Sequence, residues 1–264
     1  MLERRAAGDA TAFHAERIRL VGHTVVDGGF SPDEIADLGV RLERVLARQA
    51  EEFGGGERLA AIGDAATVRC PLVYDEAFVR LAAAPPLLAV CRALLGDYIV
   101  LMQQNGVINP PSQSHTQVAY HRDLPYQHFT SSRPLAVSAL FCVDPFTPET
   151  GATTVLPASQ HMEQFPSAAV AEALDVPVVA PPGSFIVFDS MLFHRAGANR
   201  SGRPRRAVNQ VFTIPLIAQQ ISLPDALGGR YADDPALARL FGYDTVPARS
   251  VLHWRQRRER RTPR

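Results

Sequence analysis

The chain has 264 residues, of which 46% are hydrophobic, and its 27 acidic residues equal its 27 basic residues in number. This composition is typical of a globular protein with a substantial core, and a net charge of zero gives no general attraction to nucleic acid or to anionic membranes. All of the basic residues are arginine, so the chain has no lysine for a Schiff base, and any fixed cation in a binding site must be a guanidinium.

The cysteines and the N-terminus give no sign of an exported protein. Cys70, Cys91 and Cys142 are odd in number and far apart, with no CxxC pair, so we expect them to be buried and unpaired. The first twenty residues lack the apolar segment of a signal peptide, and no stretch reaches the roughly 18 apolar residues of a membrane span. We therefore expect a cytoplasmic protein with no membrane partner.

The first third of the chain is predicted to be mainly helical. Residues 18–27 have the composition of a short strand. Residues 31–34, Ser-Pro-Asp-Glu, form a helix start signal, and apolar residues at spacings of three and four then predict an amphipathic helix to about residue 52. Residues 75–96 carry two short helical patterns divided by Pro85-Pro86.

From residue 98 the pattern changes to short β-rich runs separated by Pro, Gly, Asn or Ser: 98–108, 117–123, 134–143, 151–159, 183–190 and 205–217. Strands at this spacing after a helical segment predict a mainly β (α+β) jelly roll with the N-terminal helices packed outside the barrel. We expect one domain over residues 1–264, with its β core at about 98–217 and helical support at 18–97. The basic tail, 253–264, is predicted to be solvated and partly disordered.

The sharpest functional signal is His121-Arg122-Asp123. Side chains two apart in a strand point to the same face, so His121 and Asp123 can converge on one ion while Arg122 points away. His194 follows a late apolar strand that a jelly roll would return beside this segment. Two histidines and one carboxylate form the facial triad of non-haem Fe(II) oxygenases, which leaves three coordination positions open. HxD alone is common by chance, so the prediction depends on His194 joining it.

A centre of this kind that uses 2-oxoglutarate needs a buried cation for the distal carboxylate, and a guanidinium binds it best. Arg205 and Arg206 are the candidates. By strand parity Arg205 shares a face with Ala207 and Asn209, whose smaller side chains leave more room for a ligand, so Arg205 is preferred. The alternative is that both are surface arginines in a basic turn.

Four segments, AYHRDLPYQH, TPETGATTVLPASQH, GSFIVFDSMLFHRAGANRSG and PRRAVNQVF, together resemble the phytanoyl-CoA dioxygenase family. The resemblance runs over about residues 18–215 and implies a double-stranded β-helix that uses Fe(II), with 2-oxoglutarate and O₂ as co-substrates. His121, Asp123 and His194 match the family's metal ligands, and Arg205 stands where its 2-oxoglutarate arginine usually stands. The strand before the HxD segment resembles one that contacts the co-substrate, which points to Asn105 or Gln103.

The resemblance implies a dioxygenase that hydroxylates an unactivated C–H of a small molecule and releases succinate and CO₂. Secondary metabolites are among the candidate substrates, because the family includes many natural-product oxygenases. Ala196 stands where the family often has a small hydroxyl residue, so one hydrogen bond to 2-oxoglutarate must be missing or come from elsewhere. No family role carries to His161. Residues 126–129 are candidates for the border of the substrate pocket.

Three alternatives remain open. A cupin-like metalloprotein that performs hydrolysis or isomerisation would share the barrel and the His/Asp ligands but has no need for an arginine after the third ligand. A non-catalytic binding protein on the same fold would usually have lost one ligand. A nucleic-acid demethylase would use the arginine-rich tail, and the zero net charge disfavours it.

Overall fold

The computed structural model describes residues 9–111, 118–124 and 129–261, and within these ranges two antiparallel sheets face each other. The larger sheet has the strand order β1-β7-β4-β9-β3-β2. In that order its strands are His23–Asp27, Ser184–Asp189, Ala136–Cys142, Arg205–Thr213, Val100–Asn109 and Thr67–Arg69. The smaller sheet has the order β6-β5-β8, with strands Val176–Pro177, Thr154–Val155 and His194–Arg195. The predicted jelly roll is confirmed.

The core between the sheets follows from strand periodicity. Every residue of β7 is buried, because both faces of this strand are covered. Phe185 and Val187 belong to the cluster that packs under the helices, whereas Ile186 and Phe188 pack toward the smaller sheet with Val155.

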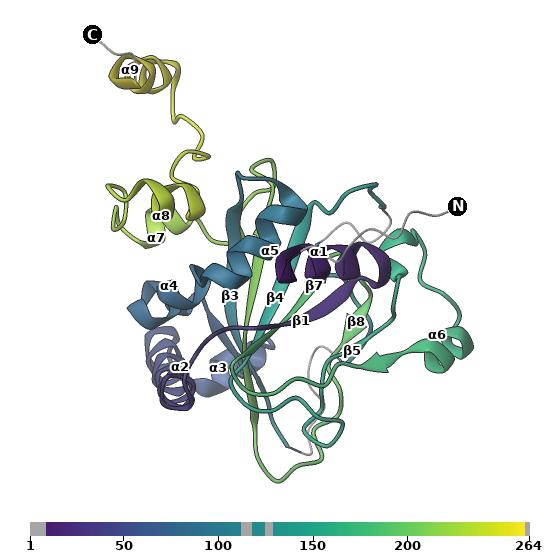
Figure 1. Ribbon diagram of the computed structural model, residues 1–264. Helices are drawn as coiled ribbons and strands as arrows, with labels where there is room; N and C mark the ends of the chain where they lie inside the picture. The colour runs from purple at the N-terminus through teal and green to yellow at the C-terminus, as the bar shows by residue number, and fades with distance from the viewer. Residues whose placement is uncertain (1–8, 112–117, 125–128, 262–264) are drawn as a thin grey trace, which may run out of the picture.

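N-terminal helices cover the outer face of the larger sheet (Figure 1). They are α1 Ala10–Val21, α2 Pro32–Phe53, α3 Gly56–Ala61, α4 Glu76–Ala82 and α5 Pro85–Leu95, with a short 3-10 turn at Pro71–Val73. The predicted start of α2 is confirmed: Ser31 and Glu34 form a capping box, and Leu38, Leu42 and Val45 are buried along one face. Cys70, Cys91 and Cys142 are free and buried, as expected.

Three expectations were wrong. Residues 18–21 belong to helix α1, which ends at the left-handed Gly22, so the first strand starts only at His23. The strand expected at 117–123 is absent over its described residues, 118–123, where His121 makes only an isolated bridge with His194. The β core was expected to begin at about residue 98, but the larger sheet also contains β1 and β2, which precede it.

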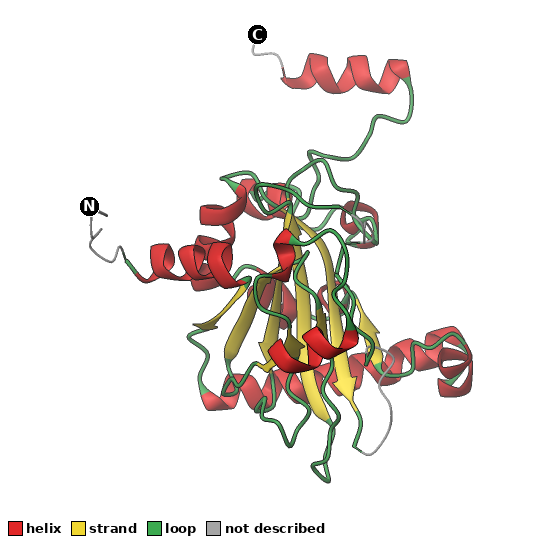
Figure 2. Cartoon of the chain, turned by 90° about the vertical axis from the view of Figure 1, so that its right-hand side faces the viewer, coloured by secondary structure: helices red, strands yellow, loops and turns green. Residues whose placement is uncertain are grey.

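The C-terminal part adds η2 Ser159–His161, α6 Ala168–Leu174, α7 Leu223–Ala226, α8 Pro235–Leu240 and α9 Val251–Arg261. The basic tail was expected to be partly disordered, but over its described residues it is helix α9, since arginine is a good helix former. This helix stands away from the sheets (Figure 2). Among the described residues no individual helix is long and apolar enough to cross a membrane, and only the bent pair α4–α5 meets the length and composition test together.

Candidate metal centre

The structure brings His121, Asp123 and His194 together. One ligand atom from each side chain lies within 4.8 Å of the other two. Two backbone hydrogen bonds create this arrangement: His121 N–H donates to the His194 carbonyl at 2.9 Å, and His194 N–H donates to the His121 carbonyl at 3.1 Å. The backbone N–H of Asp123 donates to the Ser190 carbonyl at 3.0 Å, which holds the carboxylate on the same side. These distances allow the three side chains to share one ion.

Both imidazoles are oriented for metal binding through Nε2. His121 Nδ1 lies 3.0 Å from the Ala119 carbonyl, and His194 Nδ1 lies 3.0 Å from the Leu192 carbonyl. A carbonyl only accepts, so each Nδ1 carries the proton and each Nε2 presents a lone pair. His121 Nε2 is buried and has no hydrogen-bond partner, while His194 Nε2 lies 3.5 Å from Asp123 Oδ1. The unsatisfied nitrogen is the observation that an ion would explain.

Asp123 is held by its other oxygen. Ser138 Oγ donates to Asp123 Oδ2 at 2.5 Å, and Asn209 Nδ2 donates to the same oxygen at 3.3 Å. Burial opposes ionisation of Asp123, but the adjacent His194 and the Ser138 hydrogen bond outweigh it and hold the pKa of Asp123 well below its usual range. The carboxylate is therefore charged at neutral pH, and Oδ1 faces the histidines.

The electrostatics of the two histidines differ. Burial lowers the pKa of His121, which favours the neutral form that binds a metal. Burial also acts on His194, but the charge of Asp123 prevails and raises the pKa of His194. The raised pKa favours a proton on His194 Nε2, and a bound metal ion would take the place of this proton.

Arg122, between His121 and Asp123 in the sequence, points away from the three ligands as expected, and it is only 3% exposed. Its Nε donates to the Met191 carbonyl at 2.7 Å, and its other nitrogens donate to the carbonyls of Ser159 and Met162. The guanidinium also stacks on Phe193, 3.9 Å from the ring centroid. Arg122 thereby anchors the HxD segment to η2 and to the turn that contains Met191.

A narrow inner cavity contains all three ligands together with Arg205, Thr153 and Asn209. Arg205 is 2% exposed and lies over the ring of Phe146, with its Nε and Nη1 buried and without a hydrogen-bond partner. Burial lowers the pKa of Arg205 to about 10, so the side chain remains charged at neutral pH. Sequence parity correctly placed this side chain on the inner face of β9.

Arg206 faces the other way. It forms salt bridges with Asp144 at 2.8 Å and with Glu43 of α2 at 3.0 Å. The structure thus separates the two candidate arginines: within the described part of the chain Arg205 is buried without an acidic partner, and Arg206 is paired at the outer side.

The two amides expected to contact the co-substrate lie outside the inner cavity. Gln103 lines a second, larger pocket, and Asn105 donates from Nδ2 to Gln220 Oε1 at 3.1 Å. Asn105 Oδ1 is buried and has no hydrogen-bond partner, so it stays a candidate for a ligand contact. His161, at the end of η2, has its Nε2 3.1 Å from the Arg19 carbonyl in the last turn of α1, and it does not line the inner cavity.

The outer pocket has a volume of about 750 Å³ and meets the inner cavity at Asp123, which lines both. Phe129 lines it as expected, whereas the other candidate pocket residues, 126–128, lie outside the described residues. Asp123 therefore lies between a small, mainly polar cavity that contains both histidines and a larger apolar pocket.

Sequence reasoning gave no role to Ser138 and Asn209. Both left a signal: Ser138 is the one hydroxyl residue in the apolar run AVSALFC, and Asn209 lies two residues from Ala207 on the Arg205 face. Only the register of β4 with β9 brings their side chains to the same carboxylate.

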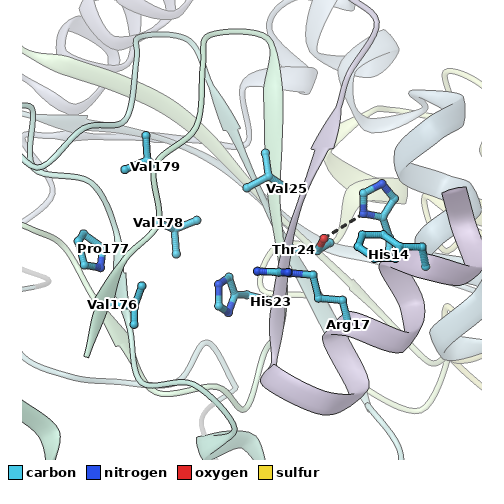
Figure 3. Close-up of a pocket in the computed structure, with 10 residues that line it drawn as sticks. His14, Arg17, His23, Thr24, Val25, Val176, Pro177, Val178 and Val179 are labelled. Carbon is cyan, nitrogen blue, oxygen red and sulfur yellow. Dashed lines mark hydrogen bonds between the residues drawn. The ribbon is translucent and has the colours of Figure 1, made fainter. Parts of the chain in front are cut away.

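A separate hollow of about 370 Å³ lies between α1, β1 and residues 176–179 (Figure 3). It is lined by His14, Arg17 and His23 on one side and by Val176, Pro177, Val178 and Val179 on the other, and it shares no residue with the metal centre. Burial lowers the pKa of both histidines, and the charge of Arg17 lowers it further.

The two facing sheets and the His/Asp/His cluster define a double-stranded β-helix protein with a mononuclear metal centre. Residues 18–207 match the profile of the phytanoyl-CoA dioxygenase (PhyH) family, and the chain belongs to that family. An uncharacterized protein of Mycobacterium tuberculosis, Rv1501, is 36% identical over 218 residues, which cover 81% of this chain and 79% of that protein.

Two solved structures share the fold. EctD from S. alaskensis, crystallised with 2-oxoglutarate and 5-hydroxyectoine, has a TM-score of 0.66 at 24% identity, over 80% of this chain and 79% of that one. The epimerase SnoN, in complex with Fe3+, alpha ketoglutarate and nogalamycin RO, has a TM-score of 0.61 at 22% identity, over 78% of this chain and 84% of that one. Family and fold support a 2-oxoglutarate-dependent oxygenase or epimerase.

Proposed function

We propose that this protein is an Fe(II)- and 2-oxoglutarate-dependent dioxygenase that hydroxylates a C–H bond of a small molecule and releases succinate and CO₂. The observation that carries the proposal is the convergence of two imidazole Nε2 atoms and Asp123 Oδ1 beside Arg205, which is buried and forms no salt bridge with any described residue.

The donor set suits ferrous iron. Two neutral nitrogens and one carboxylate oxygen are the ligands that non-haem Fe(II) oxygenases use, and they leave sites open for co-substrate and O₂. His121, Asp123 and His194 would hold the ion, while Ser138 and the carbonyls of Ala119 and Leu192 fix their orientation. When bound, iron with 2-oxoglutarate would activate O₂, which is the oxidant for C–H cleavage, while 2-oxoglutarate would be oxidised to succinate and CO₂.

Arg205 would bind the distal carboxylate of 2-oxoglutarate. A buried guanidinium with unsatisfied N–H groups is costly unless an anion meets it, and among the described residues that line the inner cavity the metal ligand Asp123 is the only carboxylate. A carboxylate that accepts two of these N–H groups would satisfy both charges.

The inner cavity also offers a replacement for the family's hydroxyl, which Ala196 lacks. Thr153 is 5% exposed and lines the same cavity as Arg205. We assign its hydroxyl to the co-substrate carboxylate, and Asn209 to the support of Asp123.

Arg205 also weighs against a cupin-like hydrolase or isomerase, because such a centre has no use for a buried cation without a partner. Asp123 weighs against halogenation, which needs an open coordination site in place of the carboxylate. Hydroxylation is preferred to epimerisation as the usual outcome in this family, and product analysis by mass spectrometry separates them, since hydroxylation adds one oxygen atom.

The test is anaerobic reconstitution with Fe(II) and 2-oxoglutarate, followed through the weak visible charge-transfer band of the chelate. Arg205→Ala should abolish the band at 2-oxoglutarate concentrations that saturate the wild type, while metal binding alone, measured by calorimetry with Co(II), survives. Arg206→Ala is the matched control: it loses two surface ion pairs but should keep the band. A band that persists in Arg205→Ala and disappears in Arg206→Ala would overturn the assignment.

A further inference from the structure

The outer pocket indicates what kind of molecule the enzyme oxidises. Its wall is formed by apolar side chains, of which Met102, Leu124 and Met191 belong to a small buried cluster at this end of the sheets. Leu135 and Ile217 pack against that cluster and complete the wall. A volume of about 750 Å³ falls within the range that holds a drug-sized ligand.

The pocket has almost no fixed charge. Among its described lining residues the metal ligand Asp123 is the only charged one. The internal segments outside the described residues, 112–117 and 125–128, contain no Asp, Glu or Arg, and the whole chain has no lysine. Arg133 lies in the loop between Phe129 and Leu135, but it is exposed and does not line the pocket. An anionic substrate would therefore be buried without a counter-ion, which costs several kcal/mol by order of magnitude.

The loaded centre would not supply a charge either. Fe(II), the Asp123 carboxylate, the 2-oxoglutarate dianion and the Arg205 guanidinium have formal charges that sum to zero. The pocket thus offers no net attraction to an anion or to a cation.

Two side-chain amides could make specific polar contacts with a substrate in this pocket. Gln103 and Gln220 both line the pocket. Gln220 Oε1 already accepts from Asn105 Nδ2, which orients the Gln220 amide so that its Nε2 is the group that can donate to a substrate. The Gln220 backbone N–H donates to the Met102 carbonyl at 3.1 Å and holds this residue beside β3. A carbonyl or hydroxyl oxygen on the substrate would suit these groups.

The rim of the pocket is apolar as well. Leu216 is 89% exposed and Phe129 is 46% exposed, and both line the pocket. Large apolar side chains held in water beside an apolar pocket are typical of a site that receives an apolar ligand.

We propose that the substrate is a neutral, largely apolar molecule of drug size that carries a carbonyl or hydroxyl group, and that coenzyme A esters, free acids and zwitterions are poor substrates. This inference rests on the proposed function, because it assumes that the outer pocket delivers the substrate to the metal centre.

The test measures binding without turnover. The full-length protein is loaded with Co(II) and 2-oxoglutarate, and Nile red, a neutral apolar dye, is added as the probe. We expect Nile red fluorescence to rise on binding. Methyl dehydroabietate should displace the dye at a concentration at least tenfold lower than dehydroabietic acid, which differs only by the free carboxylate. No dye binding, or equal or better displacement by the acid, would overturn the proposal.

Two leucine variants locate the binding site. Leu216→Glu adds a charge at the rim without a folding cost, because the side chain is exposed, and it should weaken Nile red binding at least fivefold. Leu174→Glu on α6 makes the same change at a residue that is 58% exposed and lies outside the pocket, and it should leave binding unchanged. Equal binding by the two variants would show that the dye binds elsewhere and refute the proposal.

Failure of this inference can be told apart from failure of the proposed function. A charge-transfer band with Fe(II) and 2-oxoglutarate, together with tighter binding of the free acid, would keep the oxygenase and overturn the neutral substrate class. If Arg133→Ala then removed the binding of the acid, an anionic class would replace it. Tight binding of the neutral ester without any such band would support the pocket chemistry and overturn the oxygenase.

Discussion

Arg122 is expected to maintain the geometry of the metal centre, although its side chain points away from the three ligands. Replacing it by leucine removes a charged donor from the carbonyls of Met191, Ser159 and Met162. The buried Met191 carbonyl loses this partner outright, whereas the Ser159 carbonyl keeps its bond from the Met162 N–H at 3.1 Å and Met162 is open to water. A hydrogen bond from a charged donor contributes about 1.5–3 kcal/mol, and part of this loss is offset because a guanidinium no longer has to be buried. We expect a net loss of about 3 kcal/mol in the free energy of unfolding.

For a protein of this size such a loss lowers Tm by roughly 6–12 °C. Metal affinity should fall by roughly tenfold or more, because His121 and Asp123 lose the anchor between them. Calorimetric unfolding of the metal-free protein and a Co(II) titration measure the two effects separately.

Arg195→Leu is the matched control, because Arg195 is likewise next to a metal ligand, His194. It forms a salt bridge with Asp175 at 2.9 Å and its side chain is 34% exposed, so its loss should cost no more than about 1 kcal/mol. If Arg122→Leu and Arg195→Leu had the same Tm and the same Co(II) affinity, the anchoring role of Arg122 would be wrong.

Three further changes test the surroundings of the centre. Ser138→Ala removes the 2.5 Å hydrogen bond to Asp123 and should weaken Co(II) binding roughly tenfold with little change in Tm; unchanged affinity would refute it. Gly151→Ala should lower Tm, because Gly151 has a φ of +75° and a Cβ there would lie 2.5 Å from the Gly197 carbonyl oxygen; a wild-type Tm would contradict this close approach. Burial raises the pKa of Asp189 to about 6, so the folded protein binds a proton that the unfolded chain has released, and this residue lowers stability as pH rises from about 4 to 6. Asp189→Asn should therefore gain up to about 3 kcal/mol relative to wild type between pH 4 and pH 7 in urea unfolding, and a parallel pH dependence of the two proteins would exclude it.

Local sequence patterns determined the elements that depend on short-range physics. The capping box at Ser31 and the apolar spacing of α2 specified that helix, because both act within a few residues along the chain. The β-rich runs after residue 98 likewise predicted strands β3, β4, β7 and β9, because strand propensity and the flanking turn residues also act over a few residues. Residues 18–21 were wrongly predicted to be part of a strand, because they are the last turn of α1 and Gly22 ends that helix. A glycine at this position is compatible with a helix end or with a strand until its φ is known.

The sequence was also sufficient to identify the types of metal ligand. The two-residue period of a strand predicted that Arg205 and Arg206 lie on opposite faces of β9. Tertiary structure alone decided the rest. The pairing of His121 with His194 crosses a long stretch of sequence, and the support of Asp123 comes from Ser138 and Asn209 on two other strands. Whether Gln103 meets the co-substrate cavity or the outer pocket likewise depends on which segments fold over β3. A sequence records which side chains are available, whereas distances between strands are set by the packing of the whole core, and no local pattern encodes them.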